Sequence, residues 1–181
     1  ARMGLSIIDH LTGLTTSLAL VSSVMKARET GEGRDIDVTL FDTAAHQLSY
    51  IAAWYLNEGV ETTRSPRSAH PQVTPSQLFK TSDGWLFVMA QTERFWEIFC
   101  NRIGAPEFLE REEFSEGASR RENRELLTET VDAHLITNTT AHWMDALGGH
   151  VPSAPVYGLA DALENPFLRD RGGVVTTEHP N

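Results

Sequence analysis

The most restrictive feature of this sequence is the order of patterns in its first 42 residues: an apolar helix, a glycine turn and an alternating strand. Five apolar residues recur every three or four positions and form one stripe of a helix: Leu11, Leu14, Leu18, Val21 and Met25. Gly31 and Gly33 follow, and glycine ends helices because it readily adopts the left-handed conformation. Ile36, Val38 and Leu40 then alternate with polar residues, which predicts a half-buried strand. This succession indicates an α/β fold.

Asp9 stands out because it follows two apolar residues, Ile7 and Ile8, at the opening of the predicted helix. Its ordinary interpretation is a cap, which accepts hydrogen bonds from the unpaired N–H groups of the first turn. The functional interpretation is a carboxylate that the helix dipole keeps ionised and that acts as a nucleophile. The residues alone favour the cap and leave the nucleophile as the alternative.

A second helix and a long connection follow this opening. Asp42 is placed to cap a helix that runs to about Asn57 and closes at Gly59. Its predicted buried side consists of Ala45, Leu48, Ile51, Ala52 and Tyr55. The segment 60–76 contains three prolines and is long for a connection inside a compact domain, so it predicts a linker between domains.

The remainder of the chain predicts a small α+β domain over 77–165. The turn signal Asp83-Gly84 lies between two strand-like runs, 77–80 and 85–90, and predicts a hairpin. The other predicted elements are helices over 93–103, 119–136 and 140–147, a helical turn at 161–163, an extended segment over 151–157 and a strand over 174–177.

Composition sets limits on the function. Apolar residues make up 40% of the chain and charged residues 22%, which is typical of a globular protein. The net charge of −10 argues against a general nucleic-acid binder. We expect no membrane span, no signal peptide and no metal site, because apolar runs appear too short and the histidines lack ligand spacing. Cys100 is the single cysteine, so we expect a buried thiol in a reducing, cytoplasmic compartment.

Three basic residues give the predicted linker a local positive character in an acidic chain: Arg64, Arg67 and His70. The first interpretation is a solvated linker, which the residues slightly favour. The second is contact with an anionic substrate, because arginine pairs with carboxylate and phosphate through two parallel hydrogen bonds.

An ordered set of motifs covers nearly the whole chain. The opening motif comprises Gly4, Asp9, Gly13, Arg28, Thr30, Gly31, Gly33, Asp37, Val38, Thr39, Leu40 and Asp42. Later matches are Ser82-Asp83-Gly84-Trp85, Phe95-Trp96, Asn123-Arg124, and Val151-Pro152 to Pro155-Val156. In this order the motifs resemble the type III CoA-transferase family, the CaiB/BaiF group. One departure is Arg34, where the family usually has glutamine.

The resemblance implies both an architecture and a set of site residues. Residues 1–59 correspond to part of a Rossmann-like large domain, 77–165 to a small α+β domain, and 166–181 to a return towards the large domain. Asp9 matches the catalytic nucleophile of the family. The residues expected to contact CoA or substrate are Leu40, Arg64, Arg67 and His70. The chain would then be an internal piece of a longer, interlocked homodimeric protein.

The implied reaction moves CoA from an acyl-CoA to a free carboxylic acid through a covalent aspartyl intermediate. One alternative is an acyl-CoA racemase of the same superfamily, in which the residue matching Asp9 would exchange protons with a histidine upstream of this chain. Another is a non-catalytic binding or dimerisation module. The chain alone is expected to be inactive, because the region that holds most of CoA in the family would be absent.

Overall fold

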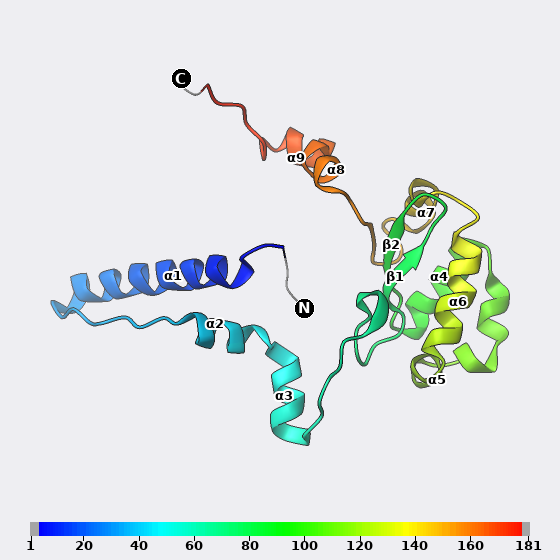
Figure 1. Ribbon diagram of the computed structural model, residues 1–181, viewed down its shortest axis with the longest axis horizontal. Coiled ribbons are helices and arrows are strands. Elements are labelled where there is room, and N and C mark those ends of the chain that lie inside the picture. The colour runs from blue at the N-terminus through cyan, green and yellow to red at the C-terminus, as the bar shows by residue number, and fades with distance from the viewer. Residues whose placement is uncertain (1–3, 179–181) are drawn as a thin grey trace. The chain divides into compact units, whose positions relative to one another are not determined.

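The computed structural model describes residues 4–178, and the chain divides into two compact units between Thr62 and Thr63 (Figure 1). The first unit contains the helices α1 (Ile7–Thr30), α2 (Leu40–Gln47) and α3 (Ser49–Glu58). The second unit contains a small sheet and the remaining helices. Each unit is described by itself.

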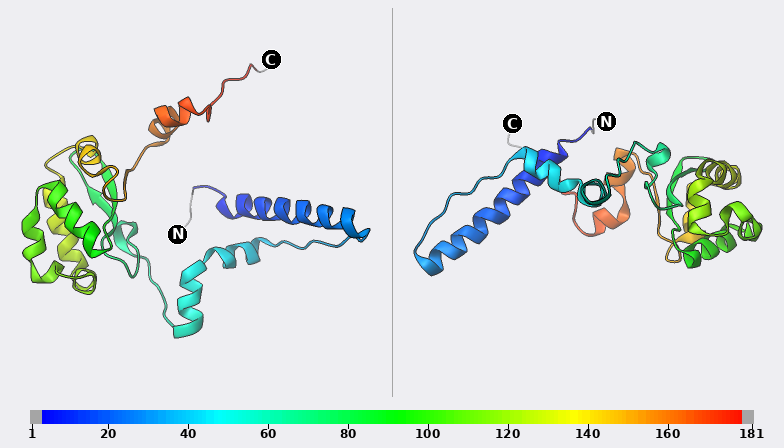
Figure 2. Two further views of the ribbon diagram at one scale, coloured as in Figure 1. Left: turned by 180° about the vertical axis from the view of Figure 1, so that it is seen from behind. Right: turned by 90° about the horizontal axis from the view of Figure 1, so that it is seen from below.

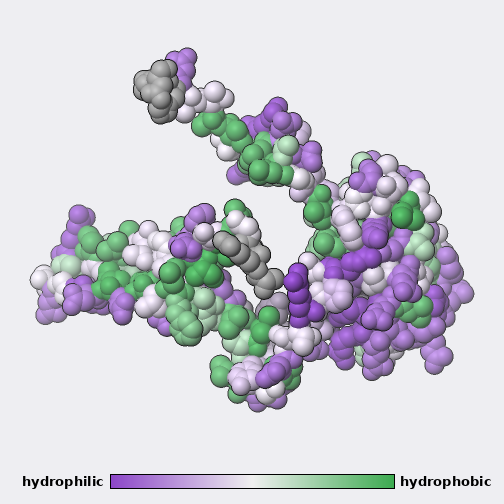
Figure 3. All heavy atoms as spheres, viewed as in Figure 1, coloured by the Kyte–Doolittle hydropathy of each residue, from purple (hydrophilic) through white to green (hydrophobic). Residues whose placement is uncertain are grey.

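Helix α1 ends where the sequence predicts. The N–H of Gly31 donates to the carbonyl of Ala27, and Gly31 has φ 77°, the left-handed conformation that suits glycine. No residue of α1 is buried, and the apolar stripe lies on the surface, with Leu18 70% exposed. Figure 3 shows apolar residues along the surface of this unit. Ile7, at the start of the helix, is also exposed.

The expectation of no membrane-length apolar run is wrong for α1. By length and composition alone, this helix is apolar enough to cross a bilayer. The reason is that no charged side chain lies between His10 and Lys26. Its hydroxyls are also satisfied within the helix, as where Thr12 donates to the carbonyl of Ile8. The core helix of a soluble protein has the same properties, so this feature is weak evidence for a membrane.

The strand predicted from Ile36 to Leu40 is not formed. Residues 32–39 have no regular secondary structure, and α2 begins at Leu40. A strand depends on hydrogen bonds to a neighbouring strand, and no strand of the described residues pairs with this segment. The helix cap is Thr39 rather than Asp42: the Thr39 hydroxyl accepts the N–H of Asp42 at 3.0 Å and donates to its carboxylate at 2.8 Å.

The single helix predicted up to Asn57 is broken in two. Ser49 has φ 48°, which interrupts the helical path, and α3 then ends at Gly59 as predicted, with φ 68°. The predicted apolar side does share one face and lines a hollow of about 560 Å³. This face is not covered, since Leu48 is 52% and Tyr55 55% exposed.

The second unit is built on a three-stranded antiparallel sheet in the order β1-β2-β3. The strands are β1 (Ser76–Lys80), β2 (Trp85–Met89) and β3 (Ser153–Pro155). The helices are α4 (Glu93–Ile103), α5 (Gly117–Glu122), α6 (Arg124–Leu135), α7 (Thr140–Leu147), α8 (Leu159–Glu164) and α9 (Pro166–Asp170). Three short 3₁₀ turns also occur, at Pro66–Ser68, Pro106–Glu110 and Glu112–Phe114. Figures 1 and 2 place α4, α5 and α6 on one side of the β1–β2 hairpin.

Between this sheet and its helices lies one apolar core. Its fully buried members include Phe79, Leu86, Val88, Phe99, Phe114, Leu127, Val131, Leu135 and Leu147. The ring of Trp96 stacks on Phe99 at 5.7 Å between centroids and meets Phe114 edge-on at 6.1 Å. The predicted hairpin and the predicted bounds of α4 and α7 are confirmed.

Local capping accounts for these confirmed elements. Thr92 caps α4 by accepting the N–H of Phe95 at 3.2 Å. Asp83, in the hairpin turn, accepts both the N–H and the hydroxyl of Thr140 at the start of α7, at 2.7 and 2.9 Å. These hydrogen bonds lower the pKa of Asp83. The turn is thereby tied to a helix almost sixty residues later.

Two predictions for the second unit are wrong, and one helix was not predicted. The helix predicted over 119–136 is interrupted at Asn123, whose φ of −100° and ψ of 28° are not helical, giving α5 and α6. The strand predicted over 174–177 does not form, and Val175 is 73% exposed with no neighbouring strand among the described residues. Helix α9, which starts at Pro166 under a cap from Asn165, was not predicted.

A completely buried guanidinium, that of Arg120, joins four segments of the second unit. It donates to both carboxylate oxygens of Glu93 at 2.9 Å, to the carbonyl of Phe114 at 2.9 Å and to that of Thr74 at 3.3 Å. Its hydrogen bond lowers the pKa of Glu93. The stabilisation from Glu93 is therefore present above the ordinary carboxyl range and is lost as the pH falls through the lowered pKa.

Replacement of this guanidinium is expected to destabilise the chain. We expect Arg120→Met to lower the free energy of unfolding by about 3 kcal/mol, because the buried carbonyls of Thr74 and Phe114 lose their donor. Arg121→Met, at the exposed neighbouring position, should change it by less than about 0.5 kcal/mol. Urea unfolding followed by tryptophan fluorescence measures both. Equal midpoints for the two variants would contradict the role given to Arg120.

The thiol of Cys100 is expected to be inert in the folded chain. Its side chain is fully buried, and burial raises its pKa to about 12, so the reactive thiolate is scarce at neutral pH. Alkylation by iodoacetamide, followed by mass spectrometry, should be slow in buffer and fast in concentrated urea. Equal rates in the two solvents would show that the thiol is accessible in the native state.

Candidate functional site

Asp9 lies in the first turn of α1, as the third residue of a helix of 24 residues. Ser6 precedes the helix and no side chain caps it, so the capping interpretation of Asp9 is not realised. The Asp9 side chain is exposed, and no described residue donates a side-chain hydrogen bond to it. The positive end of the helix dipole still favours a negative charge at this position. Asp9 is therefore an accessible carboxylate at a favourable helix end.

The surface next to Asp9 is open. Gly13 follows Asp9 by one helical turn and shares its face. A Cβ atom built on Gly13 would meet no atom within 4 Å, so the space above this turn is empty. Leu40, the other candidate in the first unit, is the first residue of α2 and is 52% exposed. This arrangement leaves room for a ligand to reach the carboxylate along the helix.

The segment between the two predicted domains is fixed to the second unit rather than solvated. Arg67 forms an ion pair with Asp132, with 2.6 Å between Nη2 and Oδ2, and lies over the ring of Trp85 at 4.7 Å. Arg124 donates to the carbonyls of His70 and Pro71, at 2.8 and 3.3 Å. Together with the bond from Arg120 to Thr74, these contacts hold the segment at three points.

The orientation of the His70 ring is set by the backbone. Its Nδ1 atom accepts the N–H groups of Gln72 and Val73, both at 3.1 Å. Backbone N–H groups are always donors, so Nδ1 is an acceptor and the neutral ring carries its proton on Nε2. The N–H of His70 donates to the carbonyl of Ser76 at 2.9 Å. The ring orientation of His70 is therefore fixed by the hydrogen bonds that Nδ1 accepts.

The candidate residues from the sequence fall into two groups. Asp9 and Leu40 belong to the first unit, whereas Arg64, Arg67 and His70 belong to the second. Within the second group, Arg67 is engaged with Asp132 and Trp85, whereas Arg64 is exposed and has no ion pair among the described residues. Among the described residues 4–178, no three histidine, cysteine, aspartate or glutamate side chains are grouped so that they could hold a metal ion.

Sequence reasoning missed the residues that hold this segment in place. Asp132 and Arg124 sit on α6, more than fifty positions from the groups they contact, and their contacts follow no local spacing. The sequence does contain the Asn123-Arg124 motif, but the motif alone predicts no contact for either residue. The structure assigns Arg124 to the carbonyls of the His70-Pro71 pair.

Comparison with solved structures gives the class of fold. The crystal structure of a CaiB/BaiF family protein from Brucella suis matches 95% of this chain with a TM-score of 0.78 and 26% sequence identity, and the match covers 46% of that chain. The fold of this chain is therefore that of part of a CaiB/BaiF protein, as the sequence predicted.

The sequence then gives the family. The chain matches CoA-transferase family III over residues 1–181 and belongs to that family. It is 26% identical over 179 residues to a succinyl-CoA:mesaconate CoA-transferase from Haloarcula hispanica, a match that covers 99% of this chain and 44% of the relative. It is 28% identical over 180 residues to the human succinyl-CoA:glutarate CoA-transferase, covering 99% and 41%. The chain spans less than half the length of these relatives.

The tautomer of the His70 ring directly tests the hydrogen bonds that its Nδ1 atom accepts from Gln72 and Val73. In a chain with ¹⁵N-labelled histidine at neutral or higher pH, we expect the neutral His70 ring to show a protonated Nε2 and an unprotonated Nδ1 in the NMR spectrum. His70→Asn should keep the loop, because the asparagine oxygen can accept the same N–H groups, whereas His70→Ala should loosen it. A protonated Nδ1 in the neutral ring would contradict the hydrogen bonds described here.

Proposed function

We propose that the full-length protein transfers CoA from an acyl-CoA thioester to a free carboxylic acid and that Asp9 carries the covalent intermediate. The observation that carries this proposal is an exposed aspartate in the first turn of α1, in a chain that belongs to CoA-transferase family III. Both relatives described above are named as CoA-transferases. A carboxylate is the group that this exchange needs, as the bond changes make clear.

The first half of the exchange places CoA on the enzyme. A carboxylate oxygen of Asp9 attacks the thioester carbonyl of the donor, the C–S bond breaks, and CoA leaves as a thiolate. The product is a mixed anhydride between the acyl group and Asp9. The thiolate then attacks the carbonyl carbon of Asp9 in this anhydride, which forms an aspartyl-CoA thioester and releases the first acid as a carboxylate.

The second half runs the same steps in reverse with the acceptor. The carboxylate of the second acid attacks the aspartyl thioester and expels the CoA thiolate, which gives a new anhydride. The thiolate attacks the acyl carbonyl of the acceptor, and Asp9 is regenerated as a carboxylate. Each activated acyl bond is exchanged for another, so the reaction needs no ATP and no net proton.

Two properties of α1 fit this role. The N–H groups of the first helical turn have no partner within the helix, so they can donate to the oxyanions that form during each attack. The open space over Gly13 admits the thioester next to Asp9. An anhydride exposed to water would hydrolyse, so we infer that other segments of the full-length protein cover Asp9 during the reaction.

The acceptor that we propose is a small dicarboxylic acid. The names of the relatives contain succinyl, mesaconate and glutarate, all of which derive from dicarboxylic acids. We propose that Arg64, in the segment that also carries His70, contacts the second carboxylate and that Leu40 contacts an apolar part of the substrates. Arg67 instead positions the segment through Asp132. We further propose a homodimer that acts in the cytoplasm.

The decisive variant is Asp9→Asn in the full-length protein. With succinyl-CoA as donor and glutarate as acceptor, we expect transfer to fall by roughly 10³-fold or more, because the amide is a poor nucleophile. In the 181-residue chain, where Asp9 is exposed, the free energy of unfolding should change by less than about 1 kcal/mol. Asp35→Asn, which makes the same charge change at another exposed position, is the matched control.

Mass spectrometry distinguishes the possible outcomes. Peptides from the wild-type protein quenched during turnover should carry the CoA adduct on Asp9. Transfer that survives in Asp9→Asn would refute the proposal. Loss of the α-proton of a 2-methylacyl-CoA without any transfer to glutarate would indicate the racemase alternative.

A further inference from the structure

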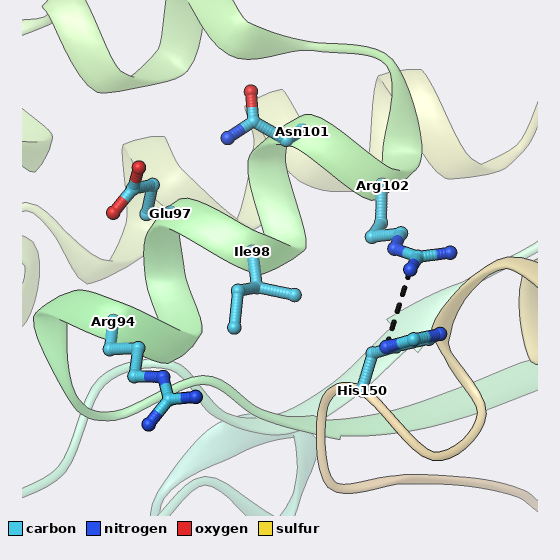
Figure 4. Close-up of a pocket in the computed structure, with 6 residues that line it drawn as sticks. All are labelled: Arg94, Glu97, Ile98, Asn101, Arg102 and His150. Atoms are coloured by element: carbon cyan, nitrogen blue, oxygen red, sulfur yellow. Dashed lines mark hydrogen bonds between the residues drawn. The ribbon is translucent and has the colours of Figure 1, made fainter.

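The second unit has a hollow of about 480 Å³ that the proposed reaction does not use (Figure 4). It lies between one face of α4 and the turn after α7, and its lining residues are Arg94, Glu97, Ile98, Asn101, Arg102 and His150. We propose that this hollow binds a small organic dianion, such as a dicarboxylate, with one anionic group at the Arg102–His150 pair and the other at Arg94.

Helical spacing places the two arginines on either side of an apolar floor. Arg94, Ile98 and Arg102 follow one another at intervals of four residues, so they share one face of α4. Figure 4 shows the Ile98 side chain between the two arginines, on the side of the helix that faces His150. Eight residues of helix separate the two arginine Cα atoms by about 12 Å along the axis. The face thus offers two cationic ends and an apolar middle.

Arg94 and Arg102 differ from several other arginines of the second unit in having no carboxylate partner among the described residues. Arg67, Arg111 and Arg120 all pair with carboxylates of the second unit. By contrast, neither Arg94 nor Arg102 forms an ion pair with any described residue, although the chain has a net charge of −10. A guanidinium without a carboxylate partner remains available for an external anion.

The place of Arg94 in the helix adds a second argument. Arg94 is the second residue of α4, where the positive end of the helix dipole repels a cation. Such a position is unfavourable for a cation unless an anion offsets the charge. The neighbouring acid Glu93 is committed to Arg120 and forms no ion pair with Arg94. A bound anion at this end would interact favourably with both the dipole and the guanidinium.

The other end of the hollow has an oriented imidazole. Nη2 of Arg102 lies 3.3 Å from Nδ1 of His150. A guanidinium only donates hydrogen bonds, so Nδ1 is the acceptor and the neutral ring carries its proton on Nε2. Arg102 and His150 thus supply adjacent N–H donors to one anionic group. Both side chains are exposed, so a ligand can enter from solvent.

One carboxylate, that of Glu97, also lines the hollow and would repel an anion. Figure 4 shows Glu97 and Asn101 directed to the other side of α4 from Ile98. The proposed ligand therefore contacts the face formed by Arg94, Ile98 and Arg102, to which the Glu97 side chain does not point. None of these residues is a candidate for the CoA-transfer site, so this proposal stands independently of the proposed function.

Titration of the 181-residue chain tests the site by binding alone. The probes are sebacate and glutarate as long and short dicarboxylates, inorganic phosphate as a compact anion and acetate as a monoanion, all at one fixed ionic strength. The NMR signals of the His150 ring and of the arginine side chains report binding. We expect saturation at millimolar sebacate, with affinity roughly five-fold or more above acetate and phosphate, because two linked groups bind together.

Variants of matched charge complete the test. Arg94→Gln and Arg102→Gln should each weaken sebacate binding roughly five-fold or more. Arg121→Gln, which removes one exposed positive charge elsewhere on the unit, should leave the affinity unchanged. Three outcomes would overturn the proposal: no saturable change with any probe, phosphate binding as tightly as sebacate, or equal weakening in the Arg121→Gln control.

Discussion

The buried guanidinium of Arg120 is the interaction on which the second unit depends. A charge placed in an apolar core is tolerated only when it is paired and all its donors are satisfied. Glu93 provides the pairing from the start of α4, and the carbonyls of Phe114 and Thr74 accept two further N–H groups. Three regions distant in sequence, at Thr74, Glu93 and 114–120, must therefore meet at one point. The segment that carries His70 leads directly into one of them.

The arginines in and around this segment show why sequence alone does not distinguish structural arginines from ligand-binding ones. The sequence proposes Arg64 and Arg67 alike for an anionic ligand and assigns no contact to Arg124. In the structure, Arg67 is paired with Asp132, and Arg124 is bonded to the carbonyls of His70 and Pro71. Only contacts across more than fifty positions make this distinction. Structure thus separates residues that build the loop from residues that remain available to a ligand.

The elements that were predicted correctly are those whose stability is local. Helix α4 has its own threonine cap and terminal glycine, and the β1–β2 hairpin has its own turn, so a short window of sequence specifies each of them. The strand predicted from Ile36 to Leu40 has the correct alternation, but it needs a partner strand that the described residues do not provide. The breaks at Ser49 and Asn123 carry no glycine or proline signal and were missed for that reason.

The role of Asp9 is the clearest case in which the local sequence does not predict the function of a residue. Local reasoning favoured a cap, yet the side chain caps nothing and stands exposed at the end of an uncovered apolar helix. Water stabilises such a carboxylate, but it would also destroy an acyl anhydride formed there. A cover that excludes water from Asp9 would have to lie against α1, whose stripe of Leu14, Leu18 and Val21 offers apolar surface to such a cover. Burial of the stripe and protection of the intermediate would then be consequences of one and the same interface.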